Sequence, residues 1–79
     1  MSDTLTKIRD YASDSLKNIK DSSVRVIQVD KIIYLDILLK TKPTLEEGTL
    51  IGQTINTVTA AVLEKGESEL KHQVFIEKS

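Results

Sequence analysis

The stretch from Lys31 to Gly66, KIIYLDILLKTKPTLEEGTLIGQTINTVTAAVLEKG, decides the fold of this chain. It begins with a β-branched and aliphatic run, passes through Pro43, and continues as a long segment with apolar residues at helical spacing. Pro43 cannot donate a hydrogen bond to a sheet and disfavours helix at the residue before it. We therefore predict a buried strand over residues 31–41, a tight connection, and an amphipathic helix over residues 44–65.

Both ends of this helix carry sequence signals. Thr44 is followed three residues later by Glu47, which is the spacing of a capping box. Gly66 is typical of the left-handed residue that ends a helix. Gly48 and Gly52 lie four residues apart on one side of the helix, where we expect the small residues to let the backbone approach a sheet closely.

The flanking segments complete the order of elements. Near the N-terminus, apolar residues at three- and four-residue steps predict a helix over residues 3–19: Leu5, Ile8, Ala12, Leu16 and Ile19. The β-branched run over residues 24–29 predicts a strand that forms a hairpin with the strand over 31–41, and Asp30 tolerates the positive φ of a short turn. A last strand is predicted over residues 70–77. A strand, a helix and a strand in succession favour a parallel, right-handed crossover.

These elements predict one α+β domain over residues 1–79, in the order helix-strand-strand-helix-strand. We expect a ferredoxin-like two-layer sandwich with both helices on one face of a three-stranded sheet. The opposite face should be polar if it meets water, yet alternation places large apolar or aromatic side chains on it. We predict that this face is a homodimer interface made of Ile32, Tyr34, Leu38 and Phe75.

Composition limits the classes of function. The chain has 79 residues, no cysteine and a formal net charge of −1, so disulfides, thiolate metal sites and the basic footprint of a nucleic-acid binder are not expected. A core this small is marginal alone, and self-association is a common remedy. The apolar runs are far shorter than the ~20 residues that span a bilayer. The composition predicts a soluble, cytoplasmic protein.

Few residues invite a chemical role. His72 is the one histidine, and without cysteines a metal site would depend on carboxylates; we read it as a solvated edge-strand residue. Asp36 lies in the middle of an apolar strand, where a salt bridge is the simpler interpretation than a ligand. The serines, the histidine and the acids do not follow a catalytic order, and no glycine-rich phosphate loop is present. We predict a protein that is not an enzyme and needs no cofactor.

Three segments resemble the cytoplasmic C-terminal domain of cation diffusion facilitator (cation efflux) metal transporters. They are DKIIYLDI (30–37), PTLEEGTLIG (43–52) and KHQVFIE (71–77). Matched by position, Asp36 takes the place of the family's strand aspartate, Glu47 of its helix-start glutamate and Glu77 of its glutamate near the end. Thr49 and Phe75 stand where the family has metal-binding histidines, and Lys78 replaces a proline.

The resemblance implies a V-shaped dimer that regulates an attached transporter, whose membrane segment is absent from this chain. It leaves an excised domain and a free-standing homologue as possibilities. Most of the usual metal ligands are missing, so at most a weak divalent metal such as zinc is implied, with Asp36, His72 and Glu77 as weak candidate ligands. A second, weaker resemblance, in element order and hydrophobic spacing, is to the alkaline shock protein family. The alternative function is a small cytoplasmic interaction module, alkaline-shock-like or unrelated, with no metal role.

Overall fold

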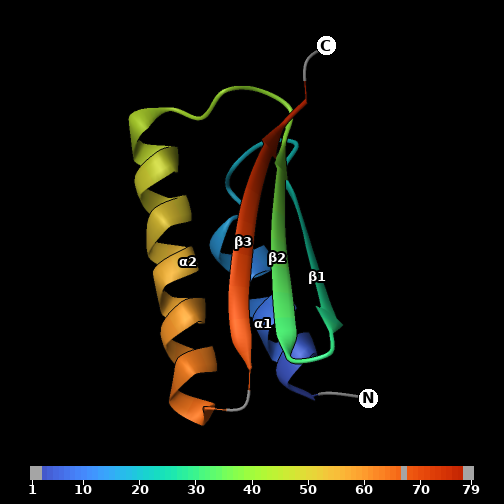
Figure 1. Cartoon of the computed structure of the whole chain (residues 1–79). Coiled ribbons are helices and arrows are strands. Elements are labelled where there is room, and N and C mark those ends of the chain that lie inside the picture. The colour runs from blue at the N-terminus through green and yellow to red at the C-terminus, as the bar shows by residue number, and fades with distance from the viewer. Residues whose placement is uncertain (1–2, 67, 78–79) are drawn as a thin grey trace.

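The computed structural model describes residues 3–66 and 68–77. It contains two helices and one three-stranded sheet, in the order predicted from the sequence (Figure 1). The elements are α1 (Asp3–Ser15), β1 (Ser23–Val29), β2 (Ile32–Leu39), α2 (Leu45–Lys65) and β3 (Glu69–Ile76). The α+β class predicted from the sequence is confirmed.

The sheet has the order β1-β2-β3, so β2 is its middle strand. β1 and β2 form an antiparallel hairpin whose turn includes Asp30 at φ 55°. β2 and β3 are parallel and are connected through α2. A parallel pair needs a crossover element between its strands, and the long helix predicted after Pro43 supplies it.

The core lies between the sheet and the helix layer. Ile33, Leu35, Ile37 and Leu39 alternate along β2 and are almost completely buried. They belong to one apolar cluster with buried residues of both helices, such as Ile8 of α1 and Val58 of α2, which places the helices on the same face of the sheet. On β3 the helix-side residues are less well covered, since Val74 and Ile76 remain 40% and 47% exposed.

The first helix is shorter than predicted. α1 ends at Ser15, not at Ile19, and the chain continues through turns to β1. The amide of Ile19 donates to the carbonyl of Leu16 at 3.0 Å, a three-residue turn, and the hydroxyl of Ser22 donates to both the Leu16 and Ile19 carbonyls at 3.2 and 2.9 Å. Leu16 and Ile19 are nevertheless buried. The three- and four-residue spacing of apolar residues therefore identified core residues correctly, although the last two of them lie beyond the end of the helix.

Helix α2 begins and ends as predicted. The Glu47 amide donates to the Thr44 hydroxyl at 3.1 Å, and the Thr44 amide donates to the Glu47 carboxylate at 2.9 Å. These reciprocal bonds form a capping box. At the other end Gly66 has φ 69°, and its amide donates to the carbonyl of Leu63 at 3.0 Å.

The expected role of Gly48 and Gly52 is wrong. A Cβ atom placed on either residue would meet no atom within 4 Å outside its own helical surroundings. The side of α2 that carries these glycines faces open space, because the buried stripe of the helix runs through other residues: Ile51, Thr54, Ile55, Val58 and Val62.

Thr44→Ala should lower the free energy of unfolding by about 1 kcal/mol, because it removes the side-chain acceptor for the Glu47 amide. Denaturant unfolding followed by circular dichroism measures this change. Thr57→Ala is the matched control, since Thr57 is an exposed residue in the middle of the same helix and alanine has the higher helix propensity. An equal loss of stability in both variants would contradict the capping role.

Gly48→Ala and Gly52→Ala should each raise the free energy of unfolding by about 0.5–1 kcal/mol, because alanine restricts the unfolded chain and meets no clash in the helix. Gly66→Ala should destabilise the domain by about 1–2 kcal/mol, because its φ of 69° is unfavourable for a residue with a Cβ atom. Thermal and denaturant unfolding of the three variants would test this difference in sign, and a destabilised Gly48→Ala would contradict it.

Candidate interaction face on the sheet

The face of the sheet turned away from the helices carries side chains in four rows, because the strand register aligns them across the sheet. We call this surface the open face (Figure 1). In the order β1, β2, β3 the rows are Ser23, Leu38 and Phe75; Arg25, Asp36 and Gln73; Ile27, Tyr34 and Lys71; Val29, Ile32 and Glu69.

Much of the open face is apolar and meets water. Ile27, Val29, Leu38 and Phe75 are between 41% and 53% exposed. Tyr34 and Ile32 are half-buried by their neighbours on the adjoining strands. A contiguous group of exposed apolar side chains on a small domain usually marks a binding surface. The open face is therefore the main candidate functional surface among the described residues.

A charged pair lies inside this apolar surface. Arg25 and Asp36 are directly opposite each other on β1 and β2, and the Arg25 Nη2 donates to Asp36 Oδ2 at 3.0 Å. The two side chains differ in exposure: that of Asp36 is 9% exposed, whereas that of Arg25 is 67% exposed. The aspartate thus lies at the base of the face and the guanidinium lies over it, open to solvent.

The structure places all four predicted interface residues on the open face. Ile32, Tyr34 and Leu38 alternate along β2, and Phe75 of β3 is aligned with Leu38. Two further members, Ile27 and Val29, were missed by the sequence analysis. The position of the hairpin turn at Asp30 and Lys31 could have predicted them. A turn at these two residues aligns Val29 with Ile32, and this register determines which residues of β1 lie on the open face. Whether a partner covers the face stays a prediction.

The three weak metal candidates are not brought together. Asp36 is on the open face and bonds to Arg25. His72 is an exposed residue aligned with Leu35, so the register places it on the helix side of β3. Glu77 follows the end of β3, and its carboxylate accepts from Lys40 Nζ at 2.6 Å. In the part of the chain that the structure describes, no three His, Cys, Asp or Glu residues form a group suited to a metal ion.

Lys40 and Glu77 join the ends of β2 and β3. The hydrogen bond from Lys40 to Glu77 and the negative charge of Glu77 raise the pKa of Lys40 above its ordinary value. Both side chains are largely exposed, so the pair contributes little to stability. It explains the position of Glu77 without a metal ion.

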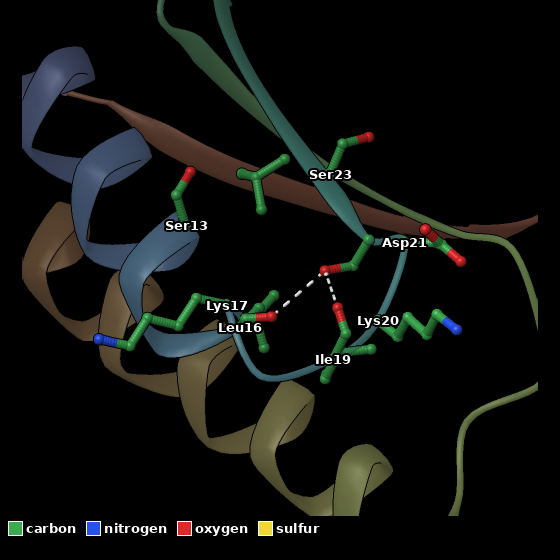
Figure 2. A pocket seen from close by; sticks show the side chains of 9 residues that line it. Ser13, Leu16, Lys17, Ile19, Lys20, Asp21 and Ser23 are labelled. Carbon is green, nitrogen blue, oxygen red and sulfur yellow. Dashed lines mark hydrogen bonds between the residues drawn. The ribbon is translucent and has the colours of Figure 1, made fainter.

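A polar cavity of about 210 Å³ lies where α1 ends and the chain turns into β1 (Figure 2). Ser22 lies in its wall, with its hydroxyl committed to the Leu16 and Ile19 carbonyls. Figure 2 shows the amino groups of Lys17 and Lys20 at opposite sides of the cavity, and Lys17 pairs with Asp14 at 3.4 Å. The two ammonium groups therefore do not point to one place, as a site for an anion would require. We interpret the cavity as a packing feature of the turn between α1 and β1.

The comparisons with known proteins differ between sequence and structure. No protein-family model and no curated protein sequence matches this chain. Among solved structures, the chain is similar to one described as "a Putative Zinc Transporter CzrB", with a TM-score of 0.47 and 10% sequence identity, covering 100% of this chain and 96% of that chain. Within residues 3–66 and 68–77, neither helix is long and apolar enough to cross a membrane.

Calorimetric titration with zinc should show no tight stoichiometric site, because Asp36, His72 and Glu77 lie in separate surroundings and cannot complete a tetrahedral shell together. His72→Gln is the matched variant, and its titration should be indistinguishable from that of the unmodified chain. Tight one-to-one binding that His72→Gln abolishes would contradict this prediction.

Proposed function

We propose that this chain is a non-catalytic interaction domain that forms a homodimer through the open face of its sheet. The observation that carries the proposal is the apolar surface built by Ile27, Val29, Tyr34, Leu38 and Phe75 on the side opposite the helices. A sheet with one solvated face normally shows polar residues there. Covering these side chains removes apolar area from water, which is the dominant favourable term in association.

The charges of the open face favour a second copy of this chain as the partner. The face carries two basic residues, Arg25 and Lys71, and two acidic residues, Asp36 and Glu69. A surface with both signs can complement itself when it is turned about a two-fold axis. A strongly basic or strongly acidic partner would meet like charges on it.

The size of the face indicates how strong the dimer should be. The three strands have seven or eight residues. With about 4.8 Å between strands and a rise of about 3.3 Å per residue, they make a flat area of roughly 14 by 26 Å. The area of the open face is therefore smaller than the ~800 Å² that each partner buries in a standard stable interface. We therefore expect a dimer that dissociates on dilution, in keeping with a regulatory contact that forms and breaks.

The sequence resemblance supports a role as a regulatory domain of the cation efflux type, since a dimer is what that resemblance implies. The separation of Asp36, His72 and Glu77 favours a version in which dimerisation does not depend on a metal site in this domain. A small interaction module with no connection to metal transport is the alternative, and the separation of these three residues agrees equally well with it. The open face serves as the interface in both.

Tyr34→Glu combined with Leu38→Glu should give a folded monomer, because the dimer would bury two unpaired carboxylates of each copy. Light scattering or sedimentation equilibrium over a range of protein concentrations measures the mass, and circular dichroism checks the fold. We expect the unmodified chain to approach twice the monomer mass as the concentration rises and the variant to stay at the monomer mass.

The matched control is Leu45→Glu combined with Leu63→Glu, which adds the same charge on α2. Leu45 and Leu63 are 89% and 61% exposed and belong to the helix layer, away from the open face. This control should dimerise like the unmodified chain. A monomeric unmodified chain at all concentrations, or a dimer unaffected by the Tyr34 and Leu38 changes, would refute the proposal.

A further inference from the structure

We infer that Arg25 bonds to Asp36 of the partner subunit across the dimer interface, in addition to Asp36 of its own chain, and that this exchange sets the orientation of the dimer. The inference rests on the proposed function, because it concerns the contacts that the open face makes with a second copy. It identifies the residues that discriminate a correctly aligned partner from a slipped one.

The location of the pair is the first step. Asp36 lies on the middle strand and in the second of the four rows, next to the centre of the open face. A two-fold axis that packs this face against itself passes near its centre and brings the central rows of both copies together. Arg25 is adjacent to Asp36 in the same row. The four charged groups of the two pairs therefore come within reach of one another.

The unequal exposure of the pair is the second step. The Asp36 side chain is 9% exposed and fixed in the sheet surface, whereas the Arg25 side chain is 67% exposed and extends toward the space that a partner would fill. A guanidinium has five N–H donors, and one of them bonds to Asp36 within the chain. The other donors are available for an acceptor approaching from outside.

The cost of burying charge is the third step. A partner that covers the open face removes water from Arg25, and a buried charge that lacks partners is strongly unfavourable. The carboxylate that a second copy offers near the centre of its open face is Asp36, while its other open-face carboxylate, Glu69, lies at the end of the face on an edge strand. An aligned dimer satisfies the guanidinium, and a slipped dimer leaves it against apolar side chains. Buried polar groups that fix register in this way are known from coiled coils.

Complementary charge reversals in two separate chains test this contact. Arg25→Glu should weaken self-association at least about tenfold, since the introduced carboxylate would face Asp36 of the partner subunit. Asp36→Lys should weaken it by a similar factor, because the introduced ammonium would face Arg25 of the partner subunit. A one-to-one mixture should restore the dimer, because the introduced carboxylate of one chain then meets the introduced ammonium of the other. In the same heterodimer the unmodified Asp36 of the first chain meets the unmodified Arg25 of the second. Native mass spectrometry with one chain isotopically labelled counts the heterodimer against both homodimers.

The mixture separates contacts between chains from contacts within a chain. Each variant still has a like-charged pair inside its own chain, so mixing restores nothing if Arg25 and Asp36 interact only within one copy. Suppose that the unmodified chain dimerises and that the Tyr34 and Leu38 changes abolish that dimer. The inference would then be overturned if the two charge-reversal variants formed homodimers and heterodimers in statistical proportions, or formed no dimer at all. A monomeric unmodified chain would instead refute the proposed function itself.

A neutral substitution keeps the test decisive if a charge reversal prevents folding. Arg25→Gln changes an exposed side chain, so it should fold, and it should raise the dissociation constant of the dimer at least about tenfold. Arg9→Gln is its matched control, because it makes the same substitution at an arginine of α1 whose side chain is 58% exposed and lies away from the open face; its dissociation constant should change less than about threefold. Equal effects of the two substitutions would overturn the inference.

Discussion

The middle strand β2 is the element on which the rest of the structure depends. It pairs with β1 on one side and with β3 on the other, and its helix-side residues, Ile33, Leu35, Ile37 and Leu39, are at most 2% exposed. A chain of this length has a thin core, so this row provides much of the apolar contact that holds α1 and α2 against the sheet. The parallel pairing with β3 then requires a helix between the two strands, and α2 fills that position.

The same strand generates the open face, because alternate side chains of a strand point to opposite sides. β2 has eight residues and is apolar at most positions. The helices cover one of its sides, and Tyr34 and Leu38 lie on the other side, which no element of the described residues covers. Asp36 interrupts that apolar row and is neutralised by Arg25 at 3.0 Å. Apolar side chains would supply the association energy of a dimer, and the charged pair would supply its orientation.

Strand alternation also accounts for the separation of the weak metal candidates. Asp36 and His72 belong to neighbouring strands, but the register aligns Asp36 with Gln73 and Leu35 with His72, so the two residues are on opposite faces. Glu77 lies beyond the end of β3 and bonds to Lys40. Positional agreement with a family motif therefore does not bring ligands together when the remaining motif positions carry Thr49 and Phe75.

Local signals in the sequence determined the element order, the capping box at Thr44 and Glu47, the left-handed end at Gly66 and the apolar alternation that places Tyr34 and Leu38 on the open face. Each depends on residues a few positions apart, which is why they could be read directly. The end of α1 at Ser15, the open space beside Gly48 and the pairing of Arg25 with Asp36 were decided by the tertiary structure. They depend on where the chain must turn to reach β1, on which stripe of α2 meets the sheet, and on the register between two strands. Those are relations between distant segments, and composition and periodicity within one segment do not contain them.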